Sequence, residues 1–213
     1  MNDIHTIIFD LDGTLSDSAL LTLTALERIA PELGLPVPEN EAIRRATGHA
    51  TPEFYYILFP GVDRDKILNA GELVEKEELS VLQSLGATLL FPGCRELLVC
   101  LRERGLRLCI ASTGKREHVY PVLEGTGIME FFDTISCARE DKAEMLREII
   151  GNNDRKQCIM VGDMKKDYEA AGANGIVSVG ALYGYCLREM SEFDLYIETP
   201  LDLLDLLEEI PCR

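Results

Sequence analysis

The sequence lacks the features that would tie the chain to a membrane or to export. No apolar stretch in its 213 residues approaches the roughly 20 that a membrane-spanning helix needs. The first residues, from Met1 to His5, show no basic region followed by a long apolar run, which is the pattern of a secretory signal peptide. We therefore expect a cytoplasmic protein with no membrane partner.

Basic residues are scarce. The chain has 21 Lys and Arg against 37 Asp and Glu, which gives a formal net charge of −16. Nucleic acids and anionic membranes attract basic surfaces, so this balance argues against both as partners. If the ligand is itself an anion, a local cation must reverse the field at the binding site.

Paired cysteines are missing as well. The seven cysteines form no CxxC pair, and no His lies at a zinc-like spacing from them. An odd number of cysteines without an export signal is typical of reduced thiols. With a hydrophobic fraction of 46%, the chain can build one ordinary core and a modest second unit without such crosslinks.

Short apolar runs alternate with helical patterns along most of the chain. The strand-length runs cover residues 4–9, 106–111, 134–136, 158–161, 176–179 and 195–197. The helical patterns between them cover residues 94–104, 116–125, 142–150, 165–173 and 201–209. This alternation predicts an α/β fold, a Rossmann-like core with a parallel sheet and helices on both faces.

Residues 16–85 break this alternation. Their periodicity is helical throughout, and prolines at positions 36, 38, 52 and 60 divide them into about four helices. We expect a small all-helical cap domain inserted after the first strand, at residues 16–85. The α/β core domain would then consist of residues 1–15 and 86–213.

The first strand ends in two carboxylates, Asp10 and Asp12, followed by Gly13. Ligands of parallel sheets bind at the carboxyl ends of the strands, so these residues lie where chemistry is expected. Asp-x-Asp-Gly also occurs in ordinary turns and in calcium loops. A calcium loop that starts at Asp10 needs a Glu at its twelfth position, where this sequence has Leu21. The pattern therefore favours a catalytic site.

Another buried-looking strand delivers Asp163 and Asp167 at its carboxyl end. If the two strands are neighbours, all four carboxylates converge, which is unfavourable unless they share protons or a cation. Hard oxygen ligands of this kind suit Mg²⁺, which also binds phosphate. The alternative interpretation is that Asp163 and Asp167 only cap the helix that begins near Lys165.

Two further positions offer contacts for an anion. The strand at 106–111 is followed by Ser112 and Thr113, which supply a hydroxyl and exposed amides just before a helix. Lys142 opens another helix and would place a point charge beside the same oxygens. Taken singly, such a Ser is usually a helix cap and such a Lys usually faces solvent.

The order of these four segments resembles the haloacid dehalogenase-like hydrolase superfamily over essentially the whole chain. The first motif of that family, DxDGT after an apolar strand, falls on residues 10–14. Its second motif falls on Ser112, with Thr113 as an alternative, and its third on Lys142. Its fourth, GDxxxD, falls on residues 162–167.

Within the superfamily, the chain resembles the phosphoglycolate phosphatase and β-phosphoglucomutase branch, which carries a helical cap after the first motif. The segments Phe-Pro-Gly at 91–93 and Tyr-Gly-Tyr at 183–185 also look like that branch. One departure is Ala143 after Lys142, where many relatives have a Pro. The substitution removes a rigid turn and leaves the charge in place.

The resemblance implies a Mg²⁺-dependent phosphatase that acts through an aspartyl-phosphate. Asp10 would be the nucleophile, and Asp12 would protonate the leaving oxygen and later activate water. The metal would be held by Asp10, the backbone carbonyl of Asp12 and Asp163. Asp167 would orient the metal shell or Lys142.

The same resemblance assigns the phosphate contacts. Ser112, Lys142 and the backbone amides of Leu11 and Thr113 would stabilise the transferring phosphoryl group. The partner implied is a small phosphorylated metabolite. Arg45 and His49 in the helical stretch are candidates for contacting its organic part, and Arg44 and Tyr55 are further candidates. A monomer or homodimer is expected.

Other activities stay open at this point. A dehalogenase typically lacks the acid at the position of Asp12, so that residue counts against it. A sugar phosphomutase must hold a second phosphate, and the cap loop at 48–53 has no Arg or Lys. Loss of Asp10 or Asp12 would have suggested a non-catalytic phosphate-binding domain, but this sequence has both residues. Phosphoglycolate, a sugar phosphate, a nucleotide and pyrophosphate all remain candidate substrates.

Overall fold

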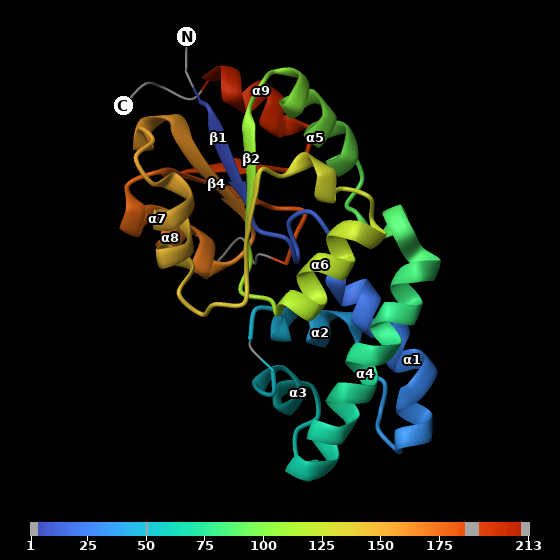
Figure 1. The fold of residues 1–213 in the computed structure, drawn as a ribbon. Coiled ribbons are helices and arrows are strands. Elements are labelled where there is room, and N and C mark those ends of the chain that lie inside the picture. Colours follow the sequence, from blue (N-terminus) through green and yellow to red (C-terminus); the bar gives the residue numbers. More distant parts are fainter. Residues whose placement is uncertain (1–3, 50, 186–191, 210–213) are drawn as a thin grey trace.

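A six-stranded parallel sheet forms the centre of the protein (Figure 1). The computed structural model describes residues 4–49, 51–185 and 192–209. The strands are β1 (Thr6–Phe9), β2 (Arg107–Ala111), β3 (Thr134–Ser136), β4 (Cys158–Gly162), β5 (Val177–Ala181) and β6 (Leu195–Ile197). Their order across the sheet is β3-β2-β1-β4-β5-β6. The apolar runs of the sequence are these strands, and the expected α/β fold is confirmed.

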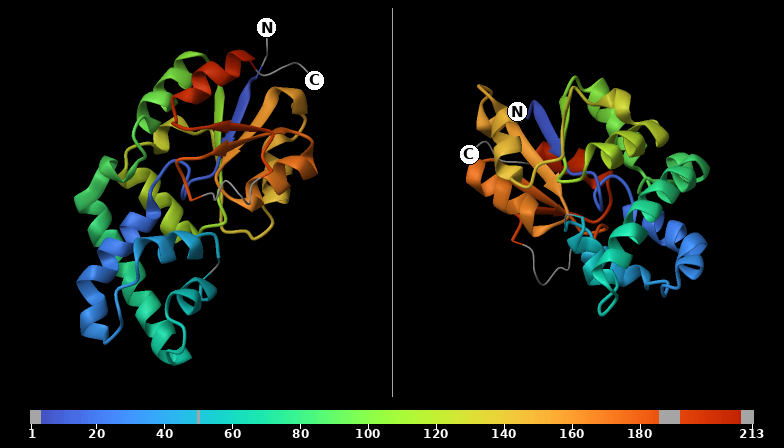
Figure 2. Two further views of the ribbon diagram at one scale, coloured as in Figure 1. Left: turned by 180° about the vertical axis from the view of Figure 1, so that it is seen from behind. Right: turned by 60° about the horizontal axis from the view of Figure 1, so that its bottom comes forward.

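Helices cover both faces of the sheet (Figure 2). They are α5 (Cys94–Glu103), α6 (Arg116–Gly125), α7 (Lys142–Ile150), α8 (Lys165–Asn174) and α9 (Asp202–Glu209). Along β1 the buried side chains alternate between two core clusters. Ile8 belongs to the cluster of α7 and α8, whereas Ile7 and Phe9 belong to the larger cluster that includes α5, α6 and α9. A strand buried on both faces lacks the alternation of apolar and polar residues seen in a half-exposed strand, as the sequence indicated.

The stretch after β1 is helical, as expected. It contains α1 (Ser18–Leu33), α2 (Asn40–Ala46), α3 (Glu53–Leu58) and α4 (Arg64–Leu85). The side chain of Asp63 caps α4 by accepting from the backbone N–H groups of Asp65 and Lys66. These helices lie together at one end of the molecule, below the sheet in Figure 1. The division of the chain into a core domain and a cap domain stays a prediction.

The chain leaves and re-enters the sheet region along paired segments. The N–H of Asp17 donates to the carbonyl of Leu89, and the N–H of Phe91 donates to the carbonyl of Leu15. The two crossings therefore run side by side. Among the described residues, no helix combines the length and apolar character needed to span a membrane.

The strand register brings three loops to one edge. Phe9 at the end of β1 lies opposite Ile110 of β2 and Val161 of β4. The residues that follow these strands, among them Asp10 and Asp163, therefore emerge together at the carboxyl edge of the sheet. Ligands of open α/β sheets bind at this edge.

We predict that Gly13→Ala destabilises the protein more than Gly61→Ala. Both glycines have a positive φ, +84° and +82°, which costs an L-residue about 1–2 kcal/mol. A Cβ at Gly13 would also lie 2.8 Å from Cγ of Asp163, whereas a Cβ at Gly61 meets nothing within 4 Å. The crowding should add about 1–3 kcal/mol. Denaturant unfolding of both variants measures the difference in the free energy of unfolding. Equal losses of stability would contradict the close packing of Gly13 against Asp163.

Candidate active site

Three buried carboxylates meet at the carboxyl edge of the sheet. Asp10, Asp163 and Asp167 each offer an oxygen, and these atoms all lie within 4.8 Å of one another. Asp10 follows β1, Asp163 follows β4, and Asp167 lies in the first turn of α8. The two strand ends singled out in the sequence are thus neighbours in space.

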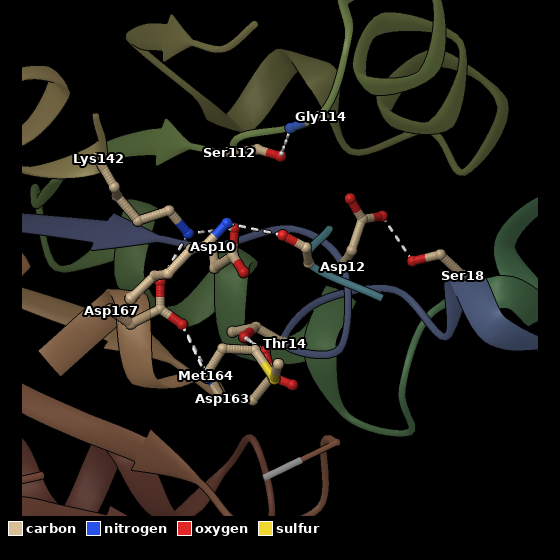
Figure 3. Close-up of polar contacts among 12 residues, drawn as sticks. Asp10, Asp12, Thr14, Ser18, Ser112, Gly114, Lys142, Asp163, Met164 and Asp167 are labelled. Carbon is tan, nitrogen blue, oxygen red and sulfur yellow. Dashed lines mark hydrogen bonds and ion pairs between the residues drawn. The ribbon is translucent and has the colours of Figure 1, made fainter. Parts of the chain in front are cut away.

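Lys142 provides the counter-charge. Its Nζ lies 2.8 Å from Oδ1 of Asp10 and 2.6 Å from Oδ1 of Asp167 (Figure 3). The side chain reaches the site from the first residue of α7 and is only 5% exposed. A buried ammonium is costly unless it is paired, so this Lys does not belong to a solvent-facing helix surface.

Asp167 and Asp163 have different structural roles. Oδ2 of Asp167 accepts from the backbone N–H groups of Asp163, at 3.1 Å, and Met164, at 2.9 Å, and so caps the start of α8. The carboxylate of Asp163 instead accepts from the Thr14 hydroxyl and from the N–H of Tyr185, both at 2.9 Å. Helix capping therefore accounts for Asp167 and leaves the burial of Asp163 to be explained otherwise.

The electrostatics of this cluster fit a bound cation. Burial raises the pKa of the Asp10 carboxyl to about 7, in spite of the neighbouring ammonium of Lys142. Burial, with the negative charges of Asp10 and Asp167, raises the pKa of Asp163 well above its ordinary value. One ammonium leaves this group of carboxylates with excess negative charge. Three buried carboxylates are a donor set suited to a divalent ion with oxygen ligands.

Asp12 lies beside this cluster, and its carboxylate has other partners. Its Oδ1 accepts from the hydroxyl of Ser18 at 2.5 Å (Figure 3). The same oxygen lies 2.8 Å from Nε2 of His118. His118 belongs to none of the four sequence motifs. A His in the first turn of the helix that follows Ser112 was the available signal, but its partner is 106 positions away in the chain.

The pKa values of Asp12 and His118 shift in opposite directions. Burial would raise the pKa of Asp12, but the imidazole of His118 and the hydrogen bonds to Oδ1 lower it below its ordinary value. Burial would lower the pKa of His118, but Asp12, followed by Glu78 and Glu75 of α4, raises it to about 9. Without a bound ligand, the contact therefore favours the charged form of each partner.

The predicted phosphate contacts lie at the same edge. Ser112 directly follows β2, is buried, and accepts from the N–H of Gly114 at 3.0 Å (Figure 3). Thr113 is half-buried next to it. Leu11, whose amide was assigned a phosphate contact, directly follows Asp10 and has a fully buried side chain.

A cavity of about 910 Å³ extends from the carboxylates toward α1 and α4. The residues that line it from the sheet side include Asp10, Asp12, Ser112, Thr113 and His118. The residues that line it from the helical stretch include Thr22, His49, Tyr55, Glu75 and Glu78. A volume of this size suits a small molecule.

The candidates in the helical stretch are placed differently from one another. His49 lines the cavity, with Nδ1 at 2.9 Å from the carbonyl of Ala46. Arg45 is exposed, donates to the backbone of Glu41, and is not among the described residues that line the cavity. Arg44 pairs with Asp17 at 3.3 Å.

Comparison with known proteins agrees with this geometry. Residues 7–181 match the family described as haloacid dehalogenase-like hydrolase. A phosphoglycolate phosphatase from Pseudomonas putida is 30% identical over 192 residues, covering 84% of this chain and 70% of the relative. One from Synechococcus elongatus is 27% identical, covering 97% and 99%. The solved structure of a haloacid dehalogenase-like hydrolase from Streptococcus pneumoniae has a TM-score of 0.79 at 25% identity, covering 97% and 99%.

The chain therefore belongs to the haloacid dehalogenase-like hydrolase family. Within it, the chain falls in the branch of phosphoglycolate phosphatase-like and β-phosphoglucomutase-like proteins. The family resemblance inferred from the four motifs is confirmed.

We predict that Lys142→Met lowers stability far more than Lys165→Met. Removing one partner from a buried ion pair typically costs about 3–5 kcal/mol, because charge is left uncompensated. Lys165 pairs with Glu169 at 3.2 Å on the exposed face of α8, where solvent screens the charges and such a pair contributes little to stability. Denaturant unfolding in metal-free buffer measures both. Similar losses in the two variants would show that Lys142 is not the main counter-charge.

Proposed function

We propose that this chain, a phosphatase of the haloacid dehalogenase-like family, hydrolyses a small-molecule phosphate monoester through an aspartyl-phosphate on Asp10, with Mg²⁺ as its cofactor. The observation that carries the proposal is the convergence of Asp163 and Asp167 on Asp10, which itself lines a cavity together with Asp12 and Ser112.

The first step is phosphoryl transfer to the enzyme. A carboxylate oxygen of Asp10 attacks phosphorus as the bond to the ester oxygen breaks, which forms the aspartyl-phosphate. Asp12 gives its proton to the leaving oxygen. Its place in the same cavity as Asp10 supports this role.

The second step is hydrolysis of the intermediate. Asp12, now a carboxylate, takes a proton from water as the water oxygen attacks phosphorus, and the bond to Asp10 breaks. Inorganic phosphate is released and both carboxyl groups return to their starting states. General acid–base assistance of this kind typically contributes about 10²–10⁴-fold to the rate.

The remaining residues bind and neutralise the phosphoryl group. Lys142 and the hydroxyl of Ser112 would contact its oxygens, together with the amides of Leu11 and Thr113. Asp10, Asp163 and the carbonyl of Asp12 would hold Mg²⁺, and Asp167 would orient the metal shell or Lys142. When bound, this ion offsets the repulsion between the substrate phosphate and the attacking carboxylate.

The helices of residues 16–85 would act as a cap domain that selects the organic part of the substrate. The named activity of the relatives supports a small phosphorylated metabolite as the substrate class. His49 lines the cavity on this side and is the stronger of the two predicted contacts, because Arg45 lies outside the lining. Cytoplasmic location is part of this proposal.

The proposal predicts that Asp10→Asn reduces hydrolysis of an aryl phosphate by about 10³-fold or more, because an amide cannot form the covalent intermediate. The variant should still unfold cooperatively on heating. Asp205→Asn on α9 is the matched control and should keep full activity. Substantial turnover by the Asp10 variant would exclude this residue as the nucleophile.

The proposal also predicts that EDTA abolishes activity and that added Mg²⁺ restores it. Asp163→Asn removes one anionic ligand, so it should raise the Mg²⁺ concentration needed for half-maximal activity. Titration of the chelated enzyme with Mg²⁺ measures this for both proteins. Turnover that persists in EDTA would rule out the metal-assisted mechanism and favour a dehalogenase-like chemistry.

A further inference from the structure

We propose that His118 is a positioning residue that orients Asp12 for proton transfer to the leaving oxygen. This role rests on the proposed function, because it concerns the first phosphoryl transfer. The motifs did not point to His118, and its importance follows from the contacts made around one oxygen of Asp12.

Two donors hold the same oxygen of Asp12. The hydroxyl of Ser18, the first residue of α1, lies 2.5 Å from Oδ1, and Nε2 of His118, in the first turn of α6, lies 2.8 Å from it. Within the part of the chain that the structure describes, no group donates a hydrogen bond to Oδ2. The arrangement therefore leaves Oδ2 as the oxygen available to a substrate.

An aspartate that acts as a proton donor needs hydrogen bonds that fix the orientation of its carboxyl group. Rotation about its Cβ–Cγ bond has only broad, shallow minima, so the carboxyl plane is poorly defined by packing alone. Two donors that approach from separate helices restrict this rotation. A general acid must lie within hydrogen-bond reach of the atom it protonates, and a displacement of about 1 Å can cost about 10²-fold in rate.

Two carboxylates of α4 add negative charge around His118. Its ring is close enough to Glu78 and Glu75 of α4 to interact with their charges. Glu78 accepts from the Thr22 hydroxyl at 2.6 Å, and Glu75 pairs with Lys115, the residue before α6, at 2.9 Å. Thr22 and Lys115 thus fix the two carboxylates whose charges act on the imidazole.

The proton transfer itself stays with Asp12. As the ester bond to phosphorus breaks, the proton on Oδ2 passes to the leaving oxygen. The Nε2–H of His118 stays hydrogen-bonded to Oδ1 and is neither lost nor gained. His118 therefore contributes geometry, which sets its expected signature apart from that of a proton shuttle.

The test compares leaving groups that differ in their need for a proton. Phenyl phosphate releases a basic phenolate that benefits from protonation, whereas 2,4-dinitrophenyl phosphate releases an anion that does not. We expect His118→Leu to lower kcat/KM for phenyl phosphate by about 10- to 100-fold. For 2,4-dinitrophenyl phosphate the loss should be about threefold or less. The use of kcat/KM confines the comparison to the first phosphoryl transfer.

Three further variants make the result specific. His118→Gln keeps an N–H near the position of Nε2 and should recover most of the activity on phenyl phosphate. Glu124→Gln, on the exposed face of α6, should behave as the wild type. In an Asp12→Asn background, His118→Leu should cause no further loss, because the group it positions is gone.

Equal losses on both substrates, or no loss on phenyl phosphate, would overturn the proposal and leave His118 with a structural role. An additional loss in the Asp12→Asn background would do the same. If His118→Leu does not fold in thermal melts, His118→Asn, whose shorter amide does not reach Asp12, takes its place. If Asp10→Asn keeps its activity the proposed function fails, whereas an inactive Asp10→Asn without a leaving-group effect removes only the role of His118.

Discussion

The site depends on the burial of like charges beside a single ammonium. Asp10, Asp163 and Asp167 lie within 4.8 Å of one another, and Lys142 neutralises only part of their charge. Such a cluster is unfavourable for the protein alone and favourable once a divalent cation is bound. The acidic surface of the chain, with its net charge of −16, is compatible with an anionic substrate for the same reason.

The fold holds these groups in place with hydrogen bonds from distant segments. Thr14 and the amide of Tyr185 fix the Asp163 carboxylate. The hydroxyl of Tyr185 donates to Oδ1 of Asp17 and accepts from the N–H of Ala19, so the loop after β5 also anchors the start of α1. Tyr185 therefore contacts both the carboxylate cluster, through its amide, and the start of the helical stretch, through its hydroxyl.

Asp10 and Asp12 differ in environment although only one residue separates them. The protein groups raise the pKa of Asp10 to about 7 and lower that of Asp12. The proposed mechanism uses the reverse order, with Asp10 ionised and Asp12 protonated. A cation bound to Asp10 lowers its pKa, and a phosphate dianion beside Asp12 raises that of Asp12. The mechanism therefore needs the bound ligands, because the side chains alone favour the opposite protonation states.

The strands, the order of the helices and the loops at the carboxyl edge of the sheet could all be predicted from the sequence. Continuous apolar runs specify buried strands, and the residues after them must lie at one edge of a parallel sheet. Resemblance to a known family then singled out Ser112 and Lys142, which single-residue arguments had left as a cap and a surface charge. Their placement at that edge agrees with this prediction.

Which side chains are partners could be learned only from the folded protein. It showed that Asp167, not Asp163, caps α8, and that Arg45 lies away from the cavity. It also paired His118 with Asp12 across 106 positions of the chain. Local patterns report what a residue does within its own helix or strand. Contacts between such distant segments depend on how the helices pack across the sheet edge, and no short-range pattern encodes that packing.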